Sequence, residues 1–162
     1  MTGTCQPVDS VSPPNENQMA ILTAAGFKDS LVVKLGYSST DNWWSVNNWC
    51  LAQGKKLISL EELQCYRSGT TNQIKTGDTE GYCCAEGISC SGGDWSSSIT
   101  NGKFSPLLTA LRSVYGTGYW FWTQSSYGND SPHSCGVFGV SVYDGRAFSR
   151  NTRAGGYQVL CQ

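Results

Sequence analysis

The chain has 162 residues, a formal charge of −1 and only 14% charged residues, which is sufficient length for one domain whose core needs no metal. It has no basic stripe that would attract a phosphate backbone, so nucleic acid is not expected as a partner. Its 19 glycines, together with many Ser, Thr and Asn residues, predict a loop-rich fold with modest helix content.

Eight cysteines make an even number, which predicts up to four disulfides in an oxidising compartment. A zinc site is disfavoured because zinc ligands favour a C-x(2–4)-C spacing, whereas Cys83 and Cys84 are adjacent and Cys90 follows after five residues. The chain has neither the charged-then-apolar pattern of a signal peptide nor an apolar run of membrane length. We therefore expect a secreted or cell-surface protein that is not embedded in a membrane, as a mature fragment with a cloned Met1.

The first elements are an arm, a helix and a strand. Residues 1–14 contain three prolines and no periodicity, so we expect an extended arm. Asn15 and Gln18 have the spacing of a capping box, which predicts a short helix that ends at Gly26. Residues 31–35 are typical of a strand.

A second helix is predicted to begin at a cap provided by Thr40 or Asp41 and to end at Gly54. Its buried stripe has members at positions i, i+3 and i+7: Trp43, Val46 and Cys50. Ser59 and Glu62 form another capping box, which predicts a short helix over residues 60–66. Capping therefore explains the acidic pair at 61–62 better than catalysis does.

Residues 67–104 are the least regular part of the chain, and we expect local cysteines to cross-link this insertion. The pair Ser105-Pro106 predicts the start of a helix that ends at Gly116. Its buried stripe consists of Leu107, Leu111 and Val114.

Four strands are predicted after residue 118, namely residues 119–124, 135–143, 146–149 and 157–161. Asp144-Gly145 is the signal of a two-residue hairpin turn. In the last strand, alternation places Tyr157, Val159 and Cys161 on one face and Leu160 on the other. The tryptophans near the helices and strands are assigned mostly to the core: Trp43, Trp44, Trp49, Trp120 and Trp122.

This order of elements resembles the C-type-lectin-like fold. The resemblance rests on Trp44-x(4)-Trp49-Cys50-x(3)-Gly54-x(2)-Leu57-x-Ser59-x(2)-Glu62, on Trp120-x-Trp122, and on Cys135, Gly145 and Val159-Leu160-Cys161. It implies an α+β fold of two to four short helices around a small twisted antiparallel sheet, loop-rich and stapled by disulfides. The lectin-like domain would span residues 31–162, with the Cys-rich insertion at about residues 67–104, after an arm and short helix at residues 1–30.

In that family a cysteine of the first helix bonds a cysteine of the last strand, which implies a disulfide between Cys50 and Cys161. Such a bond would close a ring of more than a hundred residues and stabilise the fold by on the order of 4–5 kcal/mol in the chain-entropy model. Cys135 lacks the downstream partner usual in the family, so its bond would go to Cys5 or into the insertion.

The chain is more specifically similar to bacterial surface domains of this fold and to the variable proteins of diversity-generating retroelements. The patterns that carry this likeness are Tyr119–Thr123, Val140–Gly145 and Tyr157–Cys161. It implies a ligand-binding face on the terminal sheet and its loops. The candidate residues are Ser125, Ser126, Tyr127, Asn129, Asp130, His133, Arg146, Phe148, Arg150 and Asn151, the last four at outward positions.

The sequence disfavours calcium and catalysis at this face. The Glu-Pro-Asn or Gln-Pro-Asp and Trp-Asn-Asp triplets of calcium-dependent relatives are absent, and Asn129-Asp130 falls short of the about six to eight oxygens that calcium takes. His133 is the only histidine, but no nucleophile motif accompanies it, and no spacing favours a pair of carboxylates. The Tyr, Ser, Asn and Gly residues after Thr123 resemble a paratope, although the same residues also form ordinary turns.

We therefore expect a non-enzymatic, adhesin-like domain at the tip of a bacterial or phage adhesin, or carried by a pilus or surface anchor. It would bind a protein or host-surface ligand without calcium, metal or cofactor. A carbohydrate-binding lectin is the alternative, and a small enzyme is the third hypothesis.

Overall fold

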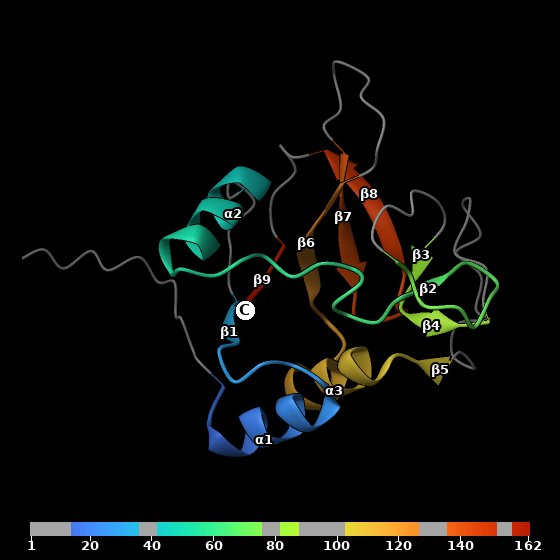
Figure 1. The fold of residues 1–162 in the computed structure, drawn as a ribbon, viewed down its shortest axis with the longest axis horizontal. Helices are drawn as coiled ribbons and strands as arrows, with labels where there is room; N and C mark the ends of the chain where they lie inside the picture. The colour runs from blue at the N-terminus through green and yellow to red at the C-terminus, as the bar shows by residue number, and fades with distance from the viewer. Residues whose placement is uncertain (1–13, 36–41, 76–81, 88–102, 127–135, 152–156) are drawn as a thin grey trace, which may run out of the picture.

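The computed structural model describes residues 14–35, 42–75, 82–87, 103–126, 136–151 and 157–162 (Figure 1). The described residues form an α+β fold of short helices and small antiparallel sheets. The helices are α1 (Glu16–Ala25), α2 (Trp43–Ala52) and α3 (Pro106–Tyr115). The strands are β1 (Val32–Lys34), β2 (Tyr66–Arg67), β3 (Tyr82–Cys83), β4 (Ala85–Glu86), β5 (Lys103–Phe104), β6 (Trp120–Ser126), β7 (Gly136–Ser141), β8 (Ala147–Asn151) and β9 (Val159–Cys161).

The helices begin at side-chain caps, because the first amides of a helix have no partner within it. The predicted capping box of α1 is confirmed: Asn15 Oδ1 accepts from Gln18 N at 2.9 Å, and Gln18 Oε1 accepts from Asn15 N at 3.0 Å. Ser105 caps α3, with proline at the first turn as predicted. The cap of α2 is Asn42 and not the predicted Thr40 or Asp41, since it is the Asn42 carboxamide that accepts from Ser45 N at 3.1 Å.

The predicted helix over residues 60–66 is wrong, although its capping box forms. Ser59 N donates to Glu62 Oε1 at 3.2 Å, and Glu62 N donates to Ser59 Oγ at 3.0 Å. The chain then makes a single turn, because Gln64 has a left-handed φ of 57° and Cys65 N bonds back to Leu60 O. Beyond it, residues 66–67 are extended as β2 and pair with β3, which a continuing helix would prevent.

The main sheet has the order β6-β7-β8, and all its pairs are antiparallel. The β7–β8 hairpin is present, but its turn has four residues rather than the predicted two. Gly145 has a φ of +74° and donates to Ser141 O at 2.9 Å, while Asp144 lacks the positive φ that a two-residue primed turn requires. The Asp144 carboxylate instead accepts from Arg146 N at 3.0 Å.

The last strand, β9, lies at the centre of a second group of extended segments. It pairs antiparallel with β1, and its Cys161 also forms an antiparallel bridge with Leu57, in the segment after α2. Just before β9, Gln158 N donates to Trp120 O at 2.7 Å, and Trp122 N donates to Gln158 O at 2.9 Å. Hydrogen bonds therefore connect the C-terminal strand to β1, to residues 56–58 and to the main sheet.

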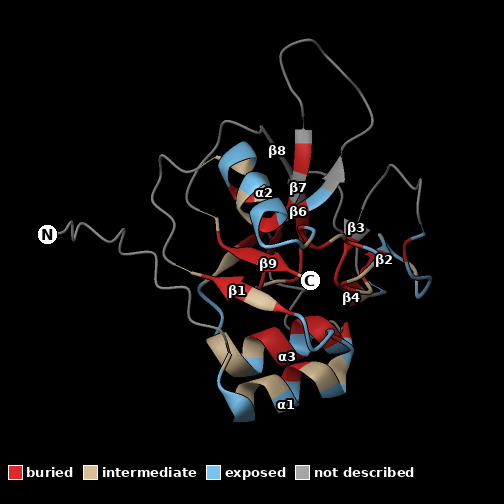
Figure 2. Ribbon diagram, turned by 60° about the vertical axis from the view of Figure 1, so that its left-hand side comes forward, coloured by how far each residue is buried: buried red, intermediate tan, exposed pale blue. Residues whose placement is uncertain are grey.

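Helices lie on both sides of the strands: Figure 2 shows α1 and α3 on one side of β1 and β9, and α2 on the other. On one side, Phe121, Val140 and Leu160 belong to a cluster that includes Leu22 of α1 and several buried leucines of α3. On the other side, a second cluster brings residues of α2 against the strands: Val46, Cys50, Leu57, Trp122, Val137, Val159 and Cys161. The two faces predicted for the last strand are confirmed, since its alternate residues enter different clusters.

Candidate functional site

Strand register brings two segments of the predicted ligand-binding face to one end of the main sheet. Ser126, the last residue of β6, pairs with Val137 near the start of β7. Val137 also pairs with Arg150 of β8, and Gly136 pairs with Asn151. Backbone positions 126 and 150–151 therefore flank the start of β7, and we call this the strand-end site.

The residues predicted for the ligand-binding face fall into two groups. Tyr127, Asn129, Asp130 and His133 lie outside the described residues. For five candidates the structure describes the main chain and not the side chain: Ser125, Ser126, Phe148, Arg150 and Asn151. Phe148 pairs with Gly139, two register steps nearer the hairpin than the pair of Val137 with Arg150.

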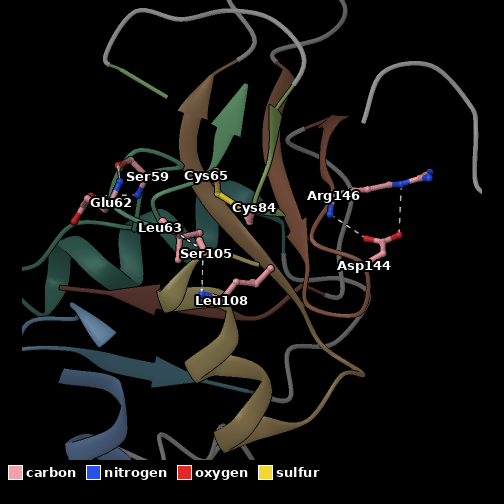
Figure 3. Close-up of a disulfide and its surroundings, with 9 residues drawn as sticks. All are labelled: Ser59, Glu62, Leu63, Cys65, Cys84, Ser105, Leu108, Asp144 and Arg146. Atoms are coloured by element: carbon pink, nitrogen blue, oxygen red, sulfur yellow. Dashed lines mark hydrogen bonds and ion pairs between the residues drawn. A yellow bond between two sulfur atoms is a disulfide. The ribbon is translucent and has the colours of Figure 1, made fainter. Parts of the chain in front are cut away.

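Arg146 was expected to point outward, and this expectation is wrong. Arg146 is only 9% exposed, and its Nε lies 3.8 Å from Asp144 Oδ2 (Figure 3). The residue forms an antiparallel backbone bridge with Cys83, so β3 lies alongside this end of the hairpin. Arg146 therefore lies at the hairpin end of the sheet, whereas the strand-end site is formed where β6 and β8 finish.

The strand end of β6 is held by contacts outside the main sheet. The register with β7 shifts between Trp122 and Ser126. Within this irregular stretch, Thr123 O accepts from Trp43 Nε1 at 2.8 Å, and Gln124 N donates to Ile58 O at 2.8 Å. Helix α2 and residues 56–58 thus position the part of β6 that leads to the strand-end site.

Disulfides connect this scaffold. The predicted Cys50–Cys161 bond is confirmed, with a Cα–Cα distance of 5.6 Å. A second bond joins Cys65 to Cys84, whose Cα atoms are 3.9 Å apart. Cys83 is also disulfide-bonded, and its partner lies outside the described residues. The insertion is therefore cross-linked locally, as its cysteines predicted.

Cys84 is the point where the insertion meets the rest of the fold (Figure 3). Its amide donates to Gly145 O at 2.7 Å, and its carbonyl accepts from Ser105 N at 2.7 Å. Ser105 Oγ in turn donates to Leu63 O at 2.9 Å and accepts from Leu108 N at 3.2 Å. The start of α3, the β7–β8 turn and the second disulfide consequently hold one another in place.

The described residues contain no group of three or more His, Cys, Asp or Glu side chains that could hold a metal ion. Within the same residues, no helix is long and apolar enough to cross a bilayer. Burial raises the pKa of Tyr115 to about 12, because the ionised phenol would lose its hydration. The Tyr115 hydroxyl is buried without a hydrogen-bond partner, and Tyr115 is the last residue of α3.

Comparison with known proteins finds no match among family models, curated proteins or solved structures.

Proposed function

We propose that the chain is a non-enzymatic, extracellular or cell-surface domain that binds a protein or host-surface ligand at the strand-end site. The observation that carries this proposal is the register, which brings the ends of β6 and β8 to the same edge of the sheet, on either side of the start of β7. Described residues of β6 and β7 enter apolar clusters on both faces of the sheet, which favours the strand ends over either face as the position of a ligand.

A C-type-lectin-like fold is the scaffold that we propose for this site. The bond from the helix cysteine Cys50 to the last-strand cysteine Cys161 supports it, as do helices on opposite sides of the strands. The Cys50–Cys161 bond and the leucine-rich core lie on other elements, while Val137 at the start of β7 is buried in the α2 cluster. Substitutions at the ends of β6 and β8, unlike one at Val137, would change ligand recognition at little cost to folding, which is the property required of a diversified bacterial or phage adhesin, including one carried on a pilus.

Binding is proposed to be independent of calcium, since the motif triplets of calcium-dependent relatives are absent from the sequence. A cation takes oxygen ligands at several positions around it, and Asn129-Asp130 alone does not supply them. A glycan bound through calcium is therefore the alternative that a chelator distinguishes.

The proposal is tested with the oxidised domain against a panel of extracellular-matrix proteins, intact host cells and glycans, in parallel with EDTA and with added calcium. For a ligand found in this way, Arg150→Ala combined with Asn151→Ala is expected to weaken binding by about tenfold or more, the usual effect of removing a central contact. Lys103→Ala is a matched control, because this β5 lysine is a cation whose side chain is 81% exposed.

Unchanged affinity in the double variant would contradict the placement of the site. Binding that requires calcium would favour the lectin alternative. Normal circular dichroism and cooperative unfolding of the double variant exclude misfolding as the cause of any loss.

A further inference from the structure

The outer face of α2 has no role in the core and carries no charge. Residues 42–54 contain no Asp, Glu, Lys or Arg. Trp44 is 52% exposed and Leu51 is 56% exposed, so the assignment of Trp44 to the core is wrong. The reason is its helical phase: Val46 and Cys50 form the buried stripe, while Trp44 and Leu51, seven residues apart, share the opposite face. Figure 2 shows that α2 has exposed residues along its length.

The Trp44 ring is held by a fixed neighbour. Trp43 donates its Nε1 hydrogen to Thr123 O at 2.8 Å. The rings of Trp43 and Trp44 meet edge to face, with centroids 4.9 Å apart and an interplanar angle of 85°. An exposed ring held in this way loses little conformational freedom when a ligand binds.

Amide groups flank the same ring. Asn47 and Asn48 lie three and four residues after Trp44, so they are its neighbours on the helix surface. Asn48 is exposed and Asn47 is half-buried. Each carboxamide offers N–H donors and an oxygen acceptor. Such a group can bond a ligand hydroxyl, which is itself both a donor and an acceptor.

The size and charge of this face favour a small neutral ligand. A stable protein interface takes about 20–30 residues from each side, whereas this face has two large apolar side chains on a ten-residue helix. A helix that binds anionic lipid surfaces carries Lys or Arg beside its apolar residues, and residues 42–54 have none. A second copy of the chain and a membrane are therefore the weaker occupants.

We propose that the outer face of α2, formed by Trp44, Asn47, Asn48 and Leu51, binds an uncharged glycan. One face of a pyranose ring presents C–H groups, which carry partial positive charge and suit the negative face of the Trp44 indole. Its hydroxyls would bond the two carboxamides, and Leu51 would contact the next sugar. This site is separate from the strand-end site and does not depend on the function proposed for it.

The test uses soluble neutral oligosaccharides of gluco, manno, galacto and xylo configuration, titrated into the oxidised full chain and followed by saturation-transfer NMR. For a single stacked sugar we expect a Kd on the order of 1 mM. Trp44→Ala is expected to weaken binding by about tenfold or more, and Trp44→Tyr by less. Tyr143→Ala is the matched control, because Tyr143 is also an exposed aromatic residue, at 66%, and it should leave binding unchanged.

Several outcomes separate this proposal from its competitors. Affinity that is unchanged between about 0.1 M and about 1 M NaCl supports a neutral ligand. The proposal is overturned if none of the oligosaccharides binds, or if Trp44→Ala binds as tightly as the parent chain. It is also overturned if Trp44→Ala instead abolishes self-association in sedimentation experiments or attachment to phosphatidylcholine vesicles. Arg150→Ala should leave sugar binding intact, so failure at the strand-end site does not affect this result.

Discussion

The regions around the two described disulfides are constructed differently. Around Cys50–Cys161, helix α2 and strands β1, β6 and β9 bury a continuous apolar cluster, and the bond joins residues 111 positions apart. Around Cys65–Cys84, which are 19 positions apart, strands β2 to β5 have two residues each. There Cys65, Ile74 and Cys84 enter the edge of the larger apolar cluster, and hydrogen bonds through Cys84 and Ser105 make further connections to the rest of the fold.

The difference shows that the two disulfides stabilise the fold in different ways. Near the C-terminus the disulfide joins elements that already pack by burial of apolar area, so it adds to an existing core. In the insertion it holds a segment whose strands are too short to be stable by themselves. The first region should therefore set the global stability of the domain, and the second should set the local order of the insertion.

The largest expected effect comes from removing the long-range bond. Cys50→Ala with Cys161→Ala should lower the free energy of unfolding by about 4–5 kcal/mol in the chain-entropy model, because the unfolded chain regains the freedom that a long ring removes. Urea denaturation followed by tryptophan fluorescence measures this loss.

The matched comparison is Cys65→Ala with Cys84→Ala, for which the shorter ring predicts about 3 kcal/mol. Hydrogen exchange should show faster opening in the insertion than in β6 and β9. If this pair lowered global stability more than the first pair does, the division between the two regions would be wrong.

An intermediate effect is expected where the two regions meet, at Ser105. Ser105→Ala removes the cap of α3 and leaves the buried Leu63 carbonyl without this donor, which should cost about 2 kcal/mol. The control is Asn42→Ala, which removes only a surface cap from α2 and should cost about 1 kcal/mol. Equal losses in thermal or urea unfolding would show that the bond from Ser105 to Leu63 contributes nothing.

The smallest effect is expected at Tyr115, at the opposite end of α3. Tyr115→Phe removes a buried hydroxyl without a partner and should leave stability unchanged or raise it by about 1 kcal/mol. In the parent chain burial raises the pKa of Tyr115 to about 12, from the ordinary tyrosine value of 10.0. Between these values the unfolded chain has lost the proton that the folded chain keeps, so stability should fall as the pH rises from 10 to 12.

The comparison of parent and Tyr115→Phe isolates this contribution, because other groups that titrate in the same range are common to both chains. Urea denaturation at pH 9 and pH 11 is the measurement. A parent chain that loses no more stability than the variant over this interval would show that Tyr115 ionises as easily when folded as when unfolded.

Local signals in the sequence predicted the three helices well. Asn15 with Gln18, and Ser105 with Pro106, mark helix starts through hydrogen bonds and a restricted φ that act within a few residues. The same kind of signal at Ser59 and Glu62 produced the right hydrogen bonds but the wrong element. Pairing of residues 66–67 with β3, which is distant in sequence, keeps the chain extended there.

The candidate site was predictable in its residue types but not in its arrangement. Alternation in β9 correctly separated Val159 from Leu160, because side-chain direction follows from strand geometry alone. Alternation could not show that Arg146 is buried where β3 pairs with the hairpin, or that the Trp44 side of α2 is exposed. Exposure depends on which segment packs against a face, and the neighbouring segment is set by contacts across the whole chain.

The amino-acid sequence by itself determined the caps of α1 and α3, the alternation of the last strand and, through the resemblance, the Cys50–Cys161 bond. Tertiary structure alone decided that the ends of β6 and β8 flank the start of β7, and that Arg146 is buried while Trp44 is exposed. The physical reason is range: caps and alternation act over a few residues, whereas register and burial are fixed by packing between segments far apart in the chain.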